Sequence, residues 1–483
     1  MFWHIAKREI YDNMTSLRFG FTVLLLVSLM TINAVDFIAR GYRDRIEEYG
    51  DKTARALDKL RQESSNIYNL TLHGPGSLHK KPSPLIFCAD GGEDNIPDEV
   101  YCTSPWTQSW GNGYSARAFG RLYYPGSGLS LTNIMPRYLQ TDWAFIIGVL
   151  VSFACILFSF DSLSGEKERG TLRLMLSGSV SRADVILGKF VGAFASIVLP
   201  LFLAIILNLL IISLSGTIEL DWSHWVRIGM ILLASVIYIA IFICLGMFVS
   251  ASSSRSSTSL LVLLLIWTVF VVLMPNILGS ICSDLRKVPS SDEISHRREK
   301  ARNDLWEKYT SKELFWSSSP APTRENPDME LLRLWAEYLT GERQTEERIT
   351  DEHLDAQLAQ IHLARQITRI SPTAIYRYAL ESMSSTGFER HRDFIANVRM
   401  HRNIFWEYIK SEDQRDPDSL HVYFVREGLS DKPASFDAAP RFTEDLSLAD
   451  SIQDALLDIA ILTLFAVLFF MTTYISFLRR DVK

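Results

Sequence analysis

The chain alternates between long apolar runs and long polar segments. Six runs carry few or no charges and approach the length of about 20 residues that an α-helix needs to cross a bilayer. They are residues 19–38, 143–160, 190–214, 225–249, 260–281 and 455–477. The apolar core of the first run is too long for a cleaved signal peptide, and no small-x-small pattern precedes Arg40. The pattern predicts a polytopic α-helical membrane protein.

An amphipathic segment precedes the first span. Between residues 1 and 18, apolar Ile5, Ala6 and Ile10 recur at helical spacing, and charged residues occupy other positions. A helix of this kind lies in the plane of the lipid headgroups. We therefore expect residues 1–18 to form an amphipathic helix at the membrane surface.

The first long polar segment covers residues 39–142. Residues 43–61 are rich in charge and alanine and predict a helix that continues the first span as a stalk. From Gly74 onward, Pro, Gly, Ser and aromatic residues predict turns and short strands. Cys88 and Cys102 both lie in this segment, where a disulfide is chemically permitted if the segment is outside the cytoplasm. Two unrelated free thiols are the alternative.

The second long polar segment covers residues 282–454. Four stretches have helical texture and are separated by prolines or polar residues: 294–309, 328–339, 346–369 and 373–406. Leu354, Leu358 and Ile361 share one helical face, a pattern that packs a core more often than it binds a ligand. We expect the two polar segments to pack together as one mostly helical domain with some short strands.

Basic residues near the span ends indicate the orientation. Lys and Arg occur before the first span, in residues 161–189, at Arg255 between spans four and five, and in residues 478–483. With six spans these segments share one side, which the positive-inside rule makes cytoplasmic. Three arginines directly after the first span oppose this assignment, but they open a long segment, where charge matters less. Both termini are therefore expected in the cytoplasm, and both long segments outside it.

Several classes of function are disfavoured. The net charge of −6 comes with an acidic excess in the long segments, so nucleic-acid binding is not indicated. No Gly-x4-Gly-Lys-[Ser/Thr] loop occurs, because Gly188-Lys189 is followed by Phe190, so we do not expect this chain to hydrolyse ATP. Neither a metal site nor a catalytic constellation emerges, and His391 and His401 in a charged helical stretch are expected to be solvated.

The predicted spans are poor in ionisable residues. An ion-coupled transporter normally carries Asp, Glu, His or Lys inside the membrane. Asn208 is the clearest polar residue within a span, and Asp458 lies near the outer end of the last one. For Asp458 a snorkelling or helix-N-terminal role is favoured over a role in transport. This composition is typical of a protein that moves, or mechanically signals to, something hydrophobic or large.

The most specific motif lies between the second and third spans. It reads Asp161-Ser-Leu-Ser-Gly-Glu-Lys-Glu-Arg-Gly-Thr-Leu-Arg-Leu-Met-Leu-Ser and continues to Arg182. Gly165 and Gly170 permit sharp turns where the chain leaves the bilayer, and a short helix is expected from Thr171. On charge alone, an ordinary inter-span loop is the simpler interpretation.

This motif resembles the signature loop of ABC-2 type permeases, the membrane subunits of ATP-binding cassette transporters. The six spans with cytoplasmic ends agree with that family. Lys81-Pro-Ser-Pro-Leu and Ser371-Pro-Thr-Ala-Ile-Tyr resemble the branch with two large outer insertions, near the permeases linked to gliding motility and to nitrous-oxide reductase maturation. The resemblance implies that the loop is a coupling helix, which docks into a cleft on an ATPase subunit, and that residues 1–18 are a connecting helix.

The resemblance further implies a set of coupling residues and partners. The coupling residues are Glu166, Lys167, Glu168, Arg169, Gly170, Thr171, Leu172 and Arg173. The partners are a separate ATPase subunit, which would bring the ATP, and a second permease copy or a paralogue; an extracytoplasmic partner protein is a further option. No cofactor is expected on this chain itself. The expected location is the inner membrane of a bacterium, and the alternative function is a membrane-anchored receptor or scaffold without transport.

Overall fold

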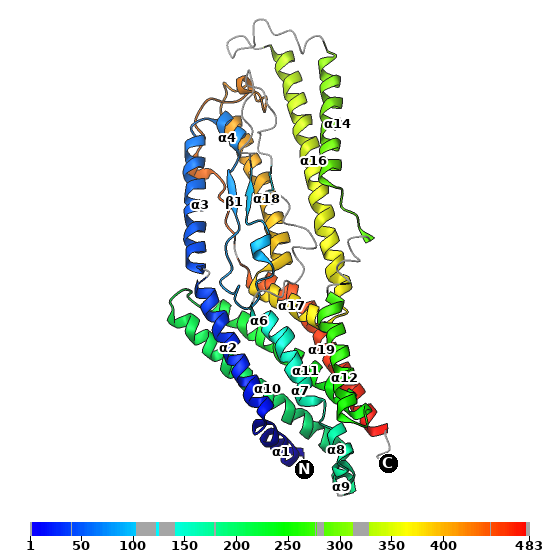
Figure 1. Ribbon diagram of the computed structural model, residues 1–483. Coiled ribbons are helices and arrows are strands. Elements are labelled where there is room, and N and C mark those ends of the chain that lie inside the picture. Colours follow the sequence, from blue (N-terminus) through cyan, green and yellow to red (C-terminus); the bar gives the residue numbers. More distant parts are fainter. Residues whose placement is uncertain are drawn as a thin grey trace.

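The protein is elongated, with apolar helices at one end and a polar domain at the other (Figure 1). The computed structural model describes residues 2–39, 41–102, 122–124, 141–177, 180–275, 277, 285–312, 328–444 and 446–479. Within these ranges most residues are helical. The first helix begins and the last helix ends at the same end of the molecule (Figure 1).

Six helical stretches are long and apolar enough to cross a membrane, and each coincides with one of the predicted runs. They are α2 (Leu17–Ala39), α6 to α7 (Trp143–Phe145 and Ser152–Ser159, joined by the π-helix η2, Ile146–Val151), α10 (Arg182–Leu214), α11 (Trp222–Ser252), α12 (Ser256–Trp267, continued by the π-helix η3, Thr268–Leu273) and α19 (Leu448–Arg479). The fold is that of a polytopic helical membrane protein with six candidate spans, as the apolar runs predict.

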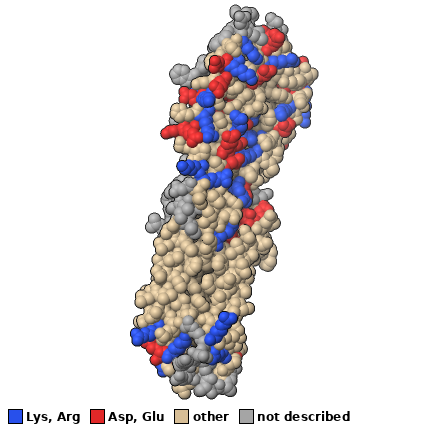
Figure 2. All heavy atoms as spheres, turned by 90° about the vertical axis from the view of Figure 1, so that its right-hand side faces the viewer, with Lys and Arg blue, Asp and Glu red and all other residues tan. Residues whose placement is uncertain are grey.

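The outer surface of this helical bundle is apolar. On α10, Leu199, Leu203, Ile206 and Leu210 recur at helical spacing and are each more than half exposed. Figure 2 shows an almost uncharged band between a charged upper half and a charged lower end. A stripe of exposed leucine and isoleucine would be costly in water and is suited to lipid tails.

The N-terminal helix α1 (Phe2–Met14) packs along α10, which confirms the helix predicted for this segment. Two glycines of α10 make the close approach sterically feasible. A Cβ on Gly188 would lie 2.8 Å from the Ile5 Cβ, and a Cβ on Gly192 would lie 2.5 Å from the Glu9 Cβ. Any larger residue at these two positions would push α1 away from α10.

The first polar segment begins with α3 (Tyr42–Glu63), separated from α2 by Gly41 at a φ of 67°. This is the predicted stalk. It is followed by α4 (Ile67–His73) and by two short antiparallel strands, β1 (Ser77–His79) and β2 (Glu99–Tyr101). A 3₁₀ turn, η1 (Glu93–Asn95), lies between the strands. The predicted turns and short strands are confirmed where this segment is described.

The second polar segment is helical, but two predicted boundaries were wrong. Its helices are α14 (Ser291–Thr310), α16 (Met329–Thr368), α17 (Pro372–Ser384) and α18 (Gly387–Gln414), followed by the 3₁₀ turns η4 (Arg426–Gly428) and η5 (Phe436–Ala438). The stretches predicted at 328–339 and 346–369 form one continuous helix, α16. The stretch predicted at 373–406 is divided, because Ser385 and Gly387 adopt positive φ angles between α17 and α18.

The two polar segments pack into one domain, as expected. Leu78 and Val100 of the small sheet share a buried apolar cluster with Leu354 of α16 and Phe388 and Phe394 of α18. The side chain of His391, also on α18, is buried rather than solvated, and this burial lowers its pKa to about 3. His401 is buried as well.

One backbone contact between the two polar segments excludes side chains altogether. A Cβ on Gly91 would lie 2.6 Å from the Gly387 Cα, and both glycines adopt positive φ angles. Only glycine accepts both the conformation and the contact at little cost. The contact holds the first segment against the turn that divides α17 from α18.

Candidate coupling site

The signature motif forms two short helices at the end of the molecule where α1 begins and α19 ends (Figure 1). These helices are α8 (Ser164–Glu168) and α9 (Thr171–Ser177). Gly170 separates them at a φ of 73°, which confirms the sharp turn predicted there. The predicted short helix is present, and a second one precedes it.

The start of α8 is fixed to α11 by a buried serine. The Ser250 hydroxyl oxygen accepts hydrogen bonds from the backbone N–H groups of Leu163 and Ser164, each 3.0 Å long. These N–H groups belong to the first turn of α8, where no intrahelical acceptor exists. The side chain of Ser250 therefore replaces the missing acceptors and attaches α8 to the end of α11.

The side chains of Lys167 and Glu168 attach α8 to the α11–α12 junction. The Lys167 ammonium donates to the backbone oxygens of Ala251 and Ser253, at the end of α11. A Glu168 carboxylate oxygen accepts from the Ser256 backbone N–H (3.2 Å) and hydroxyl (3.0 Å), at the start of α12. Both side chains thus tie α8 to the same junction from two sides.

The side chain of Glu166 faces the interior. Its Oε1 atom lies 2.8 Å from the Nζ atom of Lys189, which is almost fully buried on α10. The same Nζ atom lies 3.3 Å from the Glu9 Oε2 atom on α1. Burial raises the pKa of the Glu9 carboxyl, and Lys189 opposes this rise. One ammonium group therefore joins α1, α8 and α10.

The exposed part of the motif begins where α8 ends. Arg169, Gly170 and Thr171 are exposed, and so is Leu174 on α9, with 76% of its surface accessible. Leu172 points the other way and is completely buried. The backbone of Arg173 lies in α9, but its side chain is outside the described part. Of the eight residues predicted from the motif, Glu166, Lys167 and Glu168 hold α8 in place. Arg169, Gly170 and Thr171 provide an accessible surface, whereas Leu172 packs inward.

Sequence reasoning missed the partners of the motif. Ser250, Ser256 and Glu9 are not distinctive in the sequence, and their roles follow only from packing. Lys189 did offer a signal, because a lysine at the start of a long apolar run needs a counter-charge once it is buried. The counter-charges turn out to be Glu9 and Glu166.

The motif Ser371-Pro-Thr-Ala-Ile-Tyr joins the polar domain to the spans. Ser371 caps α17, and its hydroxyl donates to the backbone oxygen of Phe270 in η3 (2.6 Å). The Tyr376 hydroxyl lies 2.9 Å from the Ser235 hydroxyl oxygen on α11. The Tyr238 hydroxyl on α11 donates to the Gly148 backbone oxygen in η2 (2.7 Å). Hydrogen bonds therefore attach α17 directly to α11 and to η3.

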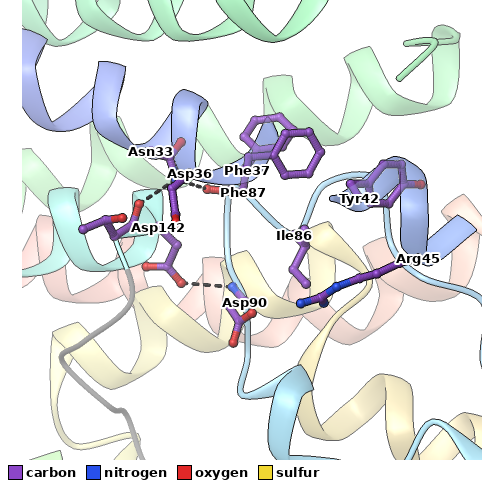
Figure 3. A pocket seen from close by; sticks show the side chains of 10 residues that line it. Asn33, Asp36, Phe37, Tyr42, Arg45, Ile86, Phe87, Asp90 and Asp142 are labelled. Carbon is purple, nitrogen blue, oxygen red and sulfur yellow. Dashed lines mark hydrogen bonds between the residues drawn. The ribbon is translucent and has the colours of Figure 1, made fainter. Parts of the chain in front are cut away.

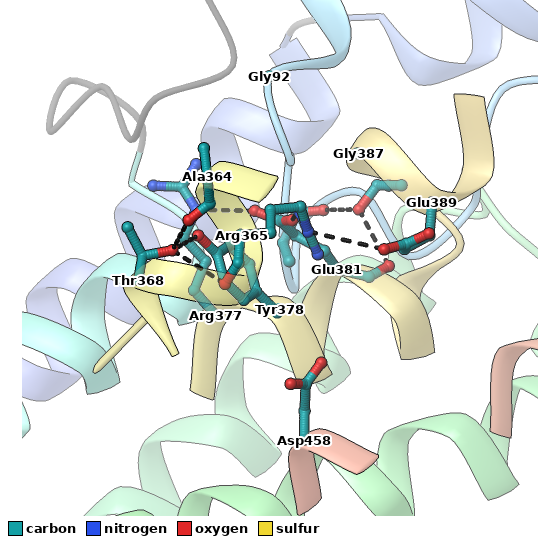
Figure 4. Close-up of polar contacts among 12 residues, drawn as sticks. Gly92, Ala364, Arg365, Thr368, Arg377, Tyr378, Glu381, Gly387, Glu389 and Asp458 are labelled. Atoms are coloured by element: carbon teal, nitrogen blue, oxygen red, sulfur yellow. Dashed lines mark hydrogen bonds and ion pairs between the residues drawn. The ribbon is translucent and has the colours of Figure 1, made fainter. Parts of the chain in front are cut away.

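Buried ion pairs strengthen the same junction. Glu381 of α17 lies between Arg365 and Arg377, with both N–O distances at 2.8 Å (Figure 4). Burial raises the pKa of the Glu381 carboxyl, but the two guanidinium groups outweigh burial and leave the pKa below its usual value. Beside this group, Asp458 of α19 pairs with Arg369 at 2.6 Å. The favoured snorkelling or helix-N-terminal role of Asp458 was wrong, because its carboxylate is buried in an ion pair.

A second polar junction lies where α2 meets the first polar segment. Asn33 of α2 donates to the backbone oxygens of Phe87 (3.1 Å) and Thr141 (2.6 Å), beside a cavity of about 40 Å³ (Figure 3). A carboxylate oxygen of Asp142 accepts from the Asp90 N–H. Asn208 of α10 completes the junction by donating to the Asn33 side-chain oxygen (2.8 Å). The polar residue noted within the third span thus has a structural partner.

The two cysteines of the first polar segment lie in different apolar clusters. Cys88 packs with the helices of the bundle, whereas Cys102 packs with the core of the polar domain. Both are buried free thiols, so the structure has no disulfide between them. Burial raises the pKa of Cys102 to about 12.

The six apolar helices and the short helices fixed to their ends are those of a polytopic helical membrane protein. The chain belongs to the ABC-2 family of transporter proteins, whose family model matches residues 3–482. It is also similar to a probable ABC transporter permease protein, NosY, from Stutzerimonas stutzeri, with 27% identity over 130 residues. That similarity covers 27% of this chain and 47% of the relative, so the chain spans about half of the length of the relative it matches.

Proposed function

We propose that this chain is the permease subunit of an ABC-2 type ABC transporter and that a separate ATPase subunit docks on α8 and α9. The observation that supports this most is the division of the signature motif. Glu166, Lys167 and Glu168 fix α8 to α10, α11 and α12. Arg169 and Leu174 remain accessible beside it. A rigidly attached segment with an exposed tip is suited to receive force from another protein.

In this proposal the end that carries α1, α8 and α9 faces the cytoplasm. Lysines and arginines cluster at this end of the bundle (Figure 2), in line with the positive-inside rule. Both termini are then cytoplasmic, and the polar domain is extracytoplasmic. The expected location is the inner membrane of a bacterium.

The contacts suggest the route by which ATP hydrolysis would act. Closure of two ATPase subunits would displace α8, and Ser250 and Ser256 would pass this displacement to α11 and α12. At the other end of the bundle, the contacts of Tyr376 and Ser371 would pass it to the polar domain. The outcome is export or mechanical signalling across the membrane, with a second permease copy or a paralogue completing the membrane half.

The proposal is tested by reversing the exposed charge. We expect Arg169→Glu, and separately Leu174→Asp, to abolish co-purification of the cognate ATPase and its stimulation by the permease. Arg8→Glu is the matched control, because Arg8 is exposed at the same end on α1 and should leave both readouts unchanged. Glu166 is unsuitable for this test, since its reversal would place a cation against buried Lys189.

Unchanged ATPase binding and activity in both variants would contradict the proposal. The alternative, a receptor or scaffold whose polar domain binds a partner without transport, predicts that no stoichiometric ATPase co-purifies with the wild-type chain. The same purification therefore separates the two functions.

A further inference from the structure

A hollow of about 560 Å³ lies at the end of the bundle where α10 leads into α11, away from the start of α10 that contacts α8. Its walls come from the base of α3, the Lys81-Pro-Ser-Pro-Leu motif, the loop between α10 and α11, and the end of α17. The Lys81-Pro-Ser-Pro-Leu motif resembles the branch of ABC-2 permeases with outer insertions. It takes no part in the coupling contacts described above. The hollow is large enough for the polar part of an amphiphilic molecule.

A buried arginine without an acidic partner lines this hollow. Arg227 of α11 is 2% exposed, and none of the described carboxylates lies within ion-pair distance of it. Its guanidinium group donates only to uncharged oxygens, namely those of Met383, Ser385, Leu446, Ser447 and Ser451. Hydrogen bonds to neutral oxygens satisfy its donors but do not neutralise its charge. An anionic group in the hollow would supply the missing counter-charge.

A second cation is held at the same hollow by its backbone. The Lys81 backbone N–H donates to Glu444 Oε2 (2.6 Å), and the Lys81 carbonyl accepts from Arg390 Nη2 (2.6 Å). Its ammonium group is exposed and forms no ion pair with the part of the chain that the structure describes. The position of Lys81 is thus fixed while its charge stays available.

Acidic groups face the hollow as well. Asp221 caps α11 by accepting from the His224 backbone N–H group (2.9 Å), and Glu47 pairs with Arg43 at 3.2 Å. Both carboxylates therefore already have a partner. Glu219 lines the hollow, is exposed and has no partner among the described residues. A ligand carrying only negative charge would be repelled by these carboxylates. A ligand with one negative and one positive group would match both Lys81 and Glu219.

The hollow lies at a membrane surface. Six of its lining residues belong to the turn that joins the candidate spans α10 and α11 or to the first residues of α11. Trp222 and Trp225 begin α11 beside this turn, and about 80% and 49% of their surfaces are exposed. Exposed tryptophans at span ends are typical of the headgroup layer.

We propose that this hollow binds the headgroup of a zwitterionic phospholipid. The Lys81 ammonium donates to the phosphate, the charge of Arg227 attracts the same group, and Glu219 accepts from the headgroup ammonium. The binding follows from the hollow and its charges alone. The topology proposed above would place this phospholipid in the outer leaflet, and only that placement rests on the proposed function.

The test uses the purified full-length chain, stripped of lipid, and native mass spectrometry with added phosphatidylethanolamine or phosphatidylglycerol. Phosphatidylethanolamine should bind more tightly. Lys81→Met should weaken its binding about tenfold, the value of one hydrogen bond between charged groups. Lys300→Met, which changes an exposed lysine on α14, is the matched control and should bind like the wild type. Glu219→Gln should shift the preference toward phosphatidylglycerol.

Three results would overturn the proposal. One is equal lipid binding by Lys81→Met and the wild type, and another is a preference of the wild type for phosphatidylglycerol. The third is competition by inorganic phosphate or by soluble phosphoethanolamine at the concentration of the lipid, which would indicate a site for a free solute. No ATPase is present in these measurements, so their failure would leave the coupling proposal standing.

Discussion

The ring of Tyr376 on α17 stacks on the ring of Tyr238 on α11, with centroids 4.4 Å apart and planes inclined by 19°. Both rings are completely buried. Tyr238 belongs to a candidate membrane span, and Tyr376 belongs to the polar domain. The pair therefore forms a dry contact across the boundary between the two halves of the protein.

Removal of this contact should destabilise the protein strongly. We expect Tyr376→Ala to lower the free energy of unfolding by about 3–5 kcal/mol, since it leaves a cavity at a buried aromatic position. Tyr376→Phe keeps the stacked ring and loses only the hydroxyl contact with Ser235, at a cost of about 1 kcal/mol. Denaturant unfolding in detergent measures both values. Equal losses in the two variants would mean that the hydroxyl, rather than the ring, supports the junction.

The buried ammonium of Lys189 should be essential for the position of α8. Lys189→Met leaves the half-buried carboxylates of Glu9 and Glu166 together without a cation, at an expected cost of up to about 3–5 kcal/mol. Adding Glu9→Gln and Glu166→Gln to Lys189→Met removes the two uncompensated charges and should recover most of the loss. Thermal unfolding of the wild type, of Lys189→Met and of the triple variant tests whether the triple variant regains stability. A triple variant no more stable than Lys189→Met would contradict the electrostatic explanation.

The Asp90 carboxyl should make stability fall as the pH rises. Burial, followed by the neighbouring Asp94 and Asp142, raises its pKa from 3.8 to about 6 in the folded protein. Between these values the folded chain keeps a proton that the unfolded chain has released, so the free energy of unfolding decreases with pH across this window. Asp90→Asn should flatten this decrease and add about 1–3 kcal/mol at pH 7.

The matched control for Asp90 is Asp98→Asn, which changes an exposed carboxyl in the same segment. Asn at position 90 can still accept the hydrogen bond from the Gly92 N–H group. The two variants are compared by unfolding curves at pH 4, 5, 6 and 7. These steps of about one unit cover the range between the usual and the raised pKa of Asp90. A slope in Asp90→Asn equal to that of Asp98→Asn would show that another group causes the pH dependence.

The ion pair of Arg369 and Asp458 should respond differently to single and double substitution. Arg369→Met leaves a buried carboxylate without its partner and should cost about 3–5 kcal/mol. Arg369→Met combined with Asp458→Leu replaces the pair by apolar side chains of similar size and should be close to wild type in stability. A double variant as unstable as the single one would indicate that the pair also fixes the angle between α16 and α19.

The sequence was sufficient to predict the six spans, the amphipathic start and the stalk, because each depends on local composition. It also placed the short helix after Gly170, since a glycine turn and an apolar stripe are local signals. The continuity of α16 was missed because residues 340–345 are polar and interrupt the apolar spacing, yet they continue the helix. Such continuity is decided by packing rather than by propensity.

The interior of the site could not be predicted in the same way. Glu166, Lys167 and Glu168 look like solvated charges in the sequence, and each is engaged by a residue far along the chain. Arg227 lies within the predicted span 225–249, and nothing in the sequence indicates that it connects α11 with the polar domain. Long-range partners of this kind leave no periodic signal, so only the folded arrangement identifies them.

The contact between Gly91 and Gly387 has a consequence for the order of assembly. Gly91 is synthesised before the second candidate span, and Gly387 only after the fifth. The first insertion must therefore wait, incompletely packed, while four further helices enter the bilayer. Chaperones or proteases would meet it during that delay, and the biogenesis of this protein is exposed to quality control for as long as the second insertion is still on the ribosome.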